Sequence, residues 1–362
     1  MELEALGWNG HFQQHFIPFQ DQNLVPARIA REHKNIYVIY AECGKLTAEV
    51  SGRFRHEAQD YSDFSSVGDW VAVKVRLEEE RATIHGLLPR KSAFSRMAVL
   101  GGKTEEQVLA ANVDTVFLVS GLDGDFNLRR IERYVAIAWD SGATPVIVLN
   151  KSDLCDDVDS ILEEVESTVL GVAAFPVSAE KKEGLDCLWE YLTPGKTVAL
   201  LGSSGVGKST LINSMLGFEQ MRTGAVRASD NKGVHTTTYR EMILAPNGGI
   251  IIDTPGMREI QLWSDEEGLS NTFGDIETLI GLCRFSDCRH NSEPDCAIQA
   301  AISDGDLDIK RYQSYVRLQR GLKHLAHRQN QKTKRREEKA WHKKISQFQK
   351  ERQKLREKGL VE

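Results

Sequence analysis

A strand that runs straight into a glycine-rich loop constrains this chain more than any other feature. The apolar stretch Thr197–Leu201 leads into the loop G-S-S-G-V-G-K-S, and Thr210–Leu216 then has helical spacing. Glycines let backbone N–H groups curl around phosphates, and the N-terminus of the following helix adds a partial positive charge. Because the full pattern lies in a strand–loop–helix context, it predicts a nucleotide-binding α/β domain rather than a glycine-rich turn that binds nothing. The predicted phosphate-loop residues are Gly202, Ser203, Ser204, Gly205, Val206, Gly207, Lys208, Ser209 and Thr210.

The loop and a second motif predict how phosphates and Mg²⁺ would be held. Lys208 is expected to reach the β- and γ-phosphates, and Ser209 is expected to bind Mg²⁺. The apolar stretch Gly249–Ile252 ends in D-T-P-G. Asp253 at the end of that strand is expected to hold Mg²⁺ through water, and Gly256 to offer its backbone N–H to the γ-phosphate.

Between these motifs lies a polar segment, K-G-V-H-T-T-T at 232–238, which favours a switch that supplies a threonine hydroxyl to Mg²⁺. Thr237 is the preferred ligand, Thr236 and Thr238 remain open, and an ordinary threonine-rich loop is the alternative. Many GTPases place Gln after D-x-x-G to orient water, but this chain has Met257. His235 is therefore the candidate for that role, against the alternative of an exposed loop histidine. No arginine finger can be assigned.

The base is read by a separate motif. The apolar strand Pro145–Leu149 ends in N-K-S-D, and Ala174–Val177 ends in S-A. The carboxylate of Asp153 can accept two N–H bonds from guanine, whereas adenine would leave it unpaired. The predicted guanine-binding residues are Asn150, Lys151, Ser152, Asp153, Ser178 and Ala179. These motifs predict that the nucleotide is GTP.

The order of the motifs is unusual. Translational-type GTPases run from the phosphate loop through D-x-x-G to N-K-x-D and S-A, but here N-K-x-D and S-A come first. If the strands keep their places in the sheet, the domain is circularly permuted, which is feasible because a compact domain's termini can be rejoined at its surface. The D-x-x-G switch would then lead directly into the C-terminal region.

The N-terminal region predicts a small barrel. Five short β-prone stretches separated by glycine-containing turns fit a five-stranded OB-type barrel. The stretches are Arg28–Ala30, Ile36–Tyr40, Thr47–Val50, Trp70–Leu77 and Ala82–Leu87. Residues 90–96, R-K-S-A-F-S-R, are interpreted as a basic linker.

A compact cysteine–histidine cluster follows the nucleotide motifs. Three thiols and one imidazole within fourteen residues match the ligand set of a tetrahedral structural Zn²⁺, with no open position for catalysis. Buried free thiols with an unrelated histidine, or an iron–sulfur site, are the alternatives. The predicted ligands are Cys283, Cys288, His290 and Cys296.

Charge is distributed unevenly. Residues 310–358 hold 18 Lys and Arg against 4 Glu, a net charge of +14, so the rest of a chain with net charge −6 carries −20. A basic, proline-free tail predicts an extended helix and a polyanionic partner, most simply nucleic acid; a solvated helix without a partner is the alternative. The absence of a long apolar run or a basic leader, together with the uneven cysteines, favours a cytoplasmic protein that contacts no membrane.

These motifs, in this order, resemble the ribosome small-subunit-dependent GTPase A family of bacterial ribosome-assembly GTPases, over roughly residues 25–316. G-V-H-T-T-T at 233–238 and E-P-D-C-A at 293–297 are the most specific pieces. The resemblance implies an OB-type domain, a zinc domain and binding to the small ribosomal subunit late in its maturation, and it also points to His235. The expected domains are residues 1–96, 97–264 and 265–362, in a protein expected to be monomeric.

The leading hypothesis is therefore a GTP-hydrolysing assembly factor, stimulated by the small subunit, that binds its rRNA and uses GTP with Mg²⁺ and one structural Zn²⁺. Two alternatives remain open from the sequence. One is a nucleotide-gated RNA-binding module in which GTP binding, rather than hydrolysis, is the functional event. The other is an enzyme that acts on RNA directly, for which no helicase or nuclease motif is found in the sequence.

Overall fold

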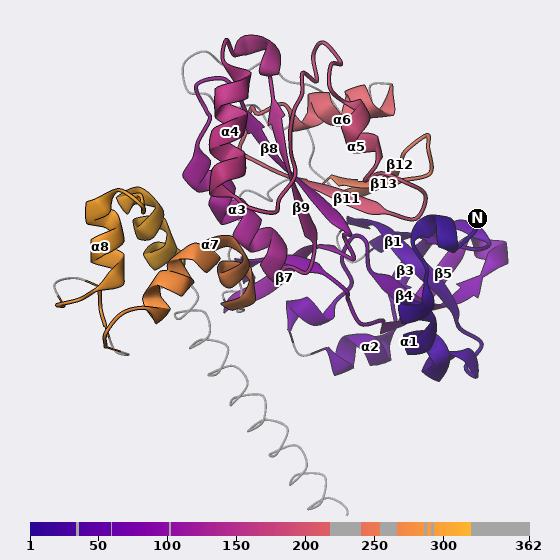
Figure 1. Cartoon of the computed structure of the whole chain (residues 1–362). Helices are drawn as coiled ribbons and strands as arrows, with labels where there is room; N and C mark the ends of the chain where they lie inside the picture. Colours follow the sequence, from indigo (N-terminus) through magenta and orange to yellow (C-terminus); the bar gives the residue numbers. More distant parts are fainter. Residues whose placement is uncertain are drawn as a thin grey trace, which may run out of the picture.

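The computed structural model describes residues 1–33, 36–58, 60–100, 103–217, 240–253, 266–285, 288–290 and 293–319. It contains an N-terminal barrel, a central α/β domain and a C-terminal helical module (Figure 1). Predictions for the switch at 232–238, for Gly256 and Met257, and for the tail after residue 319 lie outside the described residues.

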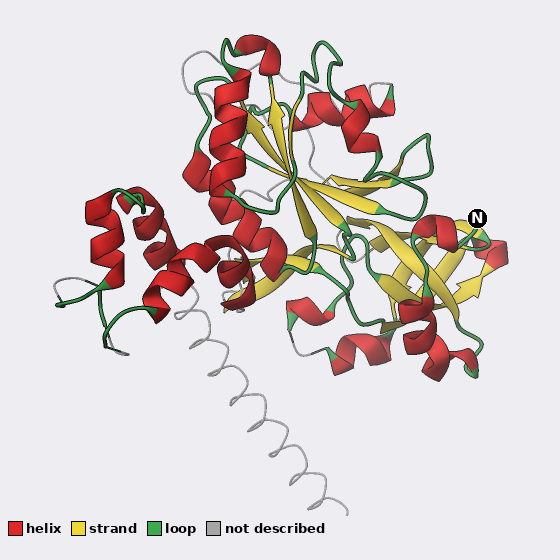
Figure 2. Ribbon diagram, viewed as in Figure 1, coloured by secondary structure: helices red, strands yellow, loops and turns green. Residues whose placement is uncertain are grey.

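The N-terminal strands close into the predicted barrel (Figure 2). Strand β1 pairs with both β2 and β4, β2 with β3, β3 in parallel with β5, and β5 with β4. Burial alternates along β3 and β5, so one face of each strand fills the barrel core. The strands span β1 Val25–His33, β2 Ile36–Ala41, β3 Gly44–Val50, β4 Trp70–Arg76 and β5 Arg81–Leu87.

Helical segments that the sequence analysis did not predict cover the barrel. Helix α1, Gly10–Gln20, begins at Asn9, whose side chain accepts the N–H of His11. Its aromatic side chains pack on the barrel, where the ring centroids of Phe12 and Trp70 lie 5.7 Å apart. The other segments are η1 Glu4–Leu6, α2 Gly52–Glu57, η2 Tyr61–Asp63 and η3 Leu77–Glu79.

The predicted basic linker is wrong for residues 93–96, which belong to a β-hairpin. Strand β6, Ala93–Leu100, pairs with β7, Lys103–Ala111, because Phe94 is buried and draws this segment into the core. Arg90 is also fixed: its Nε and Nη2 donate to the two carboxylate oxygens of buried Asp69 at 2.8 and 2.7 Å.

The central domain is a six-stranded sheet in the order β10-β9-β8-β11-β13-β12, parallel except for β12. Along β8, Val116 and Leu118 enter the core cluster on one face, while Phe117 and Val119 enter the cluster on the other. Both faces are therefore covered by helices, which explains the continuous apolar runs. The elements are β8 Thr115–Gly121, α3 Leu128–Asp140, β9 Thr144–Asn150, η4 Ser152–Leu154, α4 Val158–Thr168, β10 Ala174–Pro176, α5 Asp186–Trp189, β11 Thr197–Leu201, α6 Lys208–Leu216, β12 Glu241–Leu244 and β13 Ile250–Asp253.

Buried Arg28 joins the barrel to the central domain. Its guanidinium donates to the hydroxyl of Thr197 at 2.9 Å and to the carbonyl oxygens of Asn112 and Gly68 at 3.1 and 3.2 Å. Burial lowers the pKa of Arg28 to about 10, which leaves it charged at neutral pH. Strand β12 also pairs with β1, so the two sheets are continuous.

The C-terminal module packs on α3 (Figure 1). It contains α7 Glu266–Gly281, α8 Ala297–Asp304 and the helical residues 309–319. Glu132 of α3 is fully buried and accepts hydrogen bonds from Arg129 and from Arg311 of the C-terminal helix. Arg311 also donates to Asp275 of α7, at 2.9 and 3.0 Å, so these charged groups fix the module to the central domain. The proposed boundaries at residues 96 and 264 remain predictions.

Candidate functional site

The phosphate loop has the backbone that the motif requires. It connects β11 to α6, with Gly205 and Gly207 at φ +80° and +93°. A Cβ atom at Gly207 would lie 2.3 Å from the side-chain nitrogen of Asn150, so this position has neither the conformation nor the space for a side chain. The N-terminus of α6 has no side-chain cap, which leaves its backbone N–H groups available to an anion.

Lys208 lies over this loop. Its Nζ donates to the carbonyl oxygens of Gly202 and Ser203 at 2.9 and 2.6 Å. The ammonium group is therefore held at the loop where the sequence predicts the phosphates.

Asn150 links the predicted base loop to the phosphate loop. Its side-chain nitrogen donates to the carbonyl oxygen of Val206 at 2.8 Å, and its side-chain oxygen accepts the backbone N–H of Ala179 at 3.0 Å. Ser178 donates its hydroxyl to Asp153 at 2.7 Å, which lowers the pKa of that carboxyl group. The structure thus brings N-K-S-D, S-A and the phosphate loop together at the carboxyl edge of the sheet.

Two carboxylates that the sequence analysis missed also reach these loops. Asp123 pairs with the ammonium of Lys151 at 2.5 Å, and Asp125 accepts the hydroxyl of Ser203 at 2.5 Å. Asp125 is paired in turn with Arg130 at 3.0 Å. The two acidic residues lie two and four positions after the end of a buried parallel strand, β8. That position at the carboxyl edge is the signal that could have identified them.

Asp253 ends β13, the strand next to the phosphate-loop strand β11. Burial raises the pKa of its carboxyl group to about 6, and the charge of Lys208 opposes that rise. A cation beside this carboxyl group would favour its ionised form, so the position fits a magnesium site. The predicted partners Thr237 and Gly256, together with His235, lie outside the described residues.

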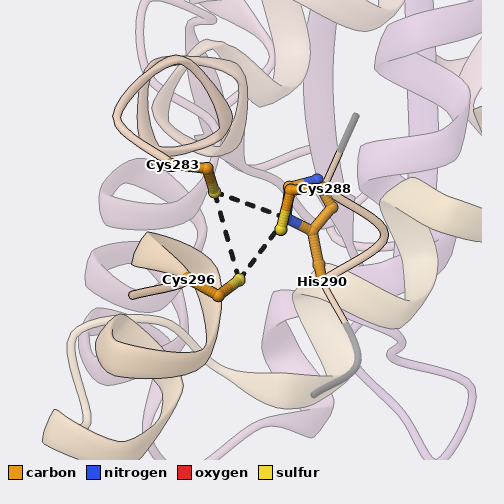
Figure 3. A group of neighbouring side chains, drawn as sticks. All are labelled: Cys283, Cys288, His290 and Cys296. Carbon is orange, nitrogen blue, oxygen red and sulfur yellow. Dashed lines mark hydrogen bonds between the residues drawn. The ribbon is translucent and has the colours of Figure 1, made fainter. Parts of the chain in front are cut away.

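The cysteine–histidine cluster is assembled as predicted (Figure 3). The sulfur atoms of Cys283 and Cys296 lie 4.0 Å apart, and each is 3.5 Å from Nδ1 of His290. All four ligand atoms, including that of Cys288, lie within 4.8 Å of one another. Tetrahedral Zn²⁺ with Zn–S near 2.3 Å and Zn–N near 2.0 Å requires S···S of about 3.8 Å and S···N of about 3.5 Å. The four residues therefore fit a zinc ion.

The chain around the cluster holds its ligands in place. Cys296 immediately precedes α8, and His290 has φ +57°, a left-handed conformation. Gln299 of α8 donates its side-chain N–H to the carbonyl oxygen of His290 at 2.6 Å. Four protein ligands leave no position for substrate, so the cluster suits a structural metal.

Comparison with known proteins agrees with this geometry. The family model "RsgA GTPase" matches residues 87–263. A model described as "ABC transporter" matches residues 187–355. That match includes the phosphate loop, which P-loop nucleotidases share, but not the guanine-recognition motif at 150–153. Among the described helices, none combines the length and the hydropathy needed to span a membrane.

The curated relatives match almost the whole chain. A protein of Opitutus terrae named "Small ribosomal subunit biogenesis GTPase RsgA" is 48% identical and covers 98% of this chain and 99% of its own. "Small ribosomal subunit biogenesis GTPase RsgA 1" of Oceanobacillus iheyensis is 43% identical and covers 94% of this chain and 98% of its own.

Two solved structures share the fold. YjeQ from Thermotoga maritima aligns with a TM-score of 0.61 at 27% identity, over 83% of this chain and 98% of its own. YloQ, described as a circularly permuted GTPase, aligns with a TM-score of 0.59 at 22% identity, over 84% of this chain and 97% of its own. The sheet order confirms the permutation, since the strand before N-K-S-D and the D-x-x-G strand lie where an unpermuted domain has them. With a barrel, a permuted nucleotide domain and near-complete alignment to its relatives, the chain belongs to the RsgA GTPase family.

Proposed function

We propose that this protein hydrolyses GTP as an assembly factor of the small ribosomal subunit, in the late maturation of that subunit. The observation that carries the proposal is the convergence of the base loop and the phosphate loop at one sheet edge, joined through Asn150. The names of the relatives, "Small ribosomal subunit biogenesis GTPase", support the same partner. GTP and GDP are then its nucleotides, subunit rRNA its macromolecular partner and the cytoplasm its compartment; we also propose a monomer.

Individual roles follow from the chemistry of each group. Asp153 reads guanine, Lys208 and the uncapped end of α6 hold phosphate, and Ser209, Thr237 and Asp253 hold Mg²⁺. Gly256 donates its N–H to the γ-phosphate. His235 orients the attacking water, since the position that often holds Gln is Met257. Mg²⁺, when bound, would neutralise charge that develops on the phosphates.

The zinc cluster and the basic tail complete the proposal. One Zn²⁺ held by the four ligands stabilises the segment that connects α7 to α8. The tail binds rRNA through counterion release. Truncation after Ala326 should weaken subunit binding and flatten its salt dependence, while GTP binding stays unchanged. If the truncated protein and the full chain bind the subunit with the same affinity and the same salt dependence, the tail takes no part in binding.

GTP turnover measured with and without purified small subunits tests the function. Subunits should raise the turnover of the wild type, and Lys208→Ala should abolish it in both conditions. His235→Ala should keep GTP affinity but lose the stimulated rate. If subunits bind only the GTP-loaded protein and never change its turnover, the protein is a nucleotide-gated binding module instead.

A further inference from the structure

One row of residues crosses from the barrel to the nucleotide centre. Strand β12 pairs with β13 on one side and with β1 of the barrel on the other. The register places Glu241 opposite Asp253 in β13 and opposite Arg31 in β1. The predicted magnesium carboxylate therefore lies two strands away from a barrel residue, in the same continuous sheet.

Side-chain contacts reinforce this row. The guanidinium of Arg31 forms an ion pair with the carboxylate of Glu241. The two side chains are 41% and 33% exposed, so solvent screens the attraction. The importance of the pair lies in geometry, because it ties the start of β12 to the barrel strand β1.

The preceding residue makes a second connection to the barrel. Nη1 of Arg240 lies 3.6 Å from the carboxylate of Glu32 in β1 and donates to the carbonyl oxygen of Val108 in β7 at 3.3 Å. Arg240 is only 16% exposed, and burial lowers its pKa, an effect that the charge of Glu32 opposes. In the sequence, only Tyr239 separates it from the predicted switch threonines. Two consecutive residues at the end of that segment are thus bound to the barrel.

Glu32 is also placed where a ligand on the barrel could act on it. It lines a cavity of about 240 Å³ between the barrel and strand β7. Aromatic side chains of the barrel and the segment after α2, Tyr37, Tyr61 and Phe64, line the same cavity. A group that entered there would contact one member of the Glu32–Arg240 pair.

We propose that Arg240 and Glu241 are positioning residues through which the barrel controls GTP hydrolysis when the protein binds the small subunit. The inference rests on the proposed function, which supplies the small subunit as the partner. Displacement of β1 on binding would move the start of β12, because both the backbone ladder and two ion pairs join them. Because β12 also pairs with β13, a displacement of β12 would in turn move Asp253. Couplings of this kind change an equilibrium by about 5- to 150-fold.

Barrel-side variants test the coupling without altering the nucleotide site. Arg31→Gln and Glu32→Gln are measured singly and together for basal GTP turnover, for subunit affinity and for turnover at saturating subunits. Basal turnover should stay within about twofold of wild type, while at saturating subunits the double variant loses most of the stimulation, at least about fivefold. Arg31→Lys keeps the positive charge, so its stimulation by subunits should exceed that of Arg31→Gln. Arg53→Gln is the matched control, because Arg53 pairs with Glu57 within helix α2.

The outcomes separate this inference from the proposed function. Full stimulation of the double variant would overturn the coupling and leave the function standing, whereas a wild type that subunits never stimulate would overturn the function. If the double variant does not fold, the reversed pair Glu32→Arg with Arg240→Glu decides. If the reversed pair is stimulated by subunits more than Glu32→Arg alone, the coupling is supported. If both variants lose the same amount of stimulation, the coupling is overturned.

Discussion

The side chain of Asn150 donates a hydrogen bond to the carbonyl oxygen of Val206, so the base loop and the phosphate loop are held as one unit. Asn150 is 2% exposed, and its second hydrogen bond fixes Ala179. The amide of Asn150 therefore contributes to the separation between the guanine site and the phosphate site.

Asn150→Ala should weaken GTP and GDP by similar factors. Loss of two buried hydrogen bonds costs about 1–3 kcal/mol, or about 5- to 150-fold in Kd. Fluorescent-nucleotide titration measures this, and Ser214→Ala is the control, because Ser214 holds only the carbonyl oxygen of Ala179, at 2.6 Å. A change confined to GTP would contradict the bridging role, since the γ-phosphate is not what Asn150 positions.

Asp153→Asn should weaken GTP and improve binding of xanthosine triphosphate. The xanthine C2 carbonyl needs a donor where guanine needs an acceptor, and the amide supplies that donor. A competition assay with both nucleotides checks the exchange. Unchanged selectivity would remove Asp153 from base recognition.

The purified protein should contain one zinc per chain, measured by elemental analysis. A chelator should unfold the C-terminal module before the nucleotide domain, because metal binding supplies its folding free energy. Cys296→Ser should lose the metal, whereas Cys187→Ser, outside the cluster, should keep it. Zinc retained at full stoichiometry in Cys296→Ser would rule out this ligand set.

Arg311→Leu should loosen the C-terminal module from α3. It removes one of the two arginines that neutralise buried Glu132, and a broken buried pair costs up to about 3–5 kcal/mol. Hydrogen exchange in α7 and in the residues of α3 beneath it should rise, while Lys310→Gln on the same helix should have little effect. Adding Glu132→Gln should recover part of the loss, and simple additivity of the two changes would argue against a direct pair.

Where apolar periodicity and motif chemistry coincide, the sequence was sufficient for prediction. The strand Thr197–Leu201 was predicted with the bounds that the structure shows. The barrel strands were placed correctly but too short or too long at their ends. The four zinc ligands were also brought together as predicted, because they lie within fourteen residues of each other.

The misses arise from contacts distant in sequence. Nothing local in residues 93–96 distinguishes a linker from a strand; pairing with β7 and burial of Phe94 decide it. Asp123 and Asp125 have no motif, and only the sheet order places them beside Lys151 and Ser203. The sequence alone does not predict the burial of Glu132, because its partner Arg311 lies 179 positions later in the chain.

The sheet order has a consequence for synthesis of the chain. Strands β8 and β9 leave the ribosome before the phosphate loop is synthesised. Strand β11 then pairs with β8, and β13, which is synthesised later, pairs with the other edge of β11. Since chains emerge at about 5–20 residues per second, the nascent domain spends seconds with the edge of β8 unpaired. Nucleotide binding can begin only after that edge is filled, because the phosphate loop directly follows β11.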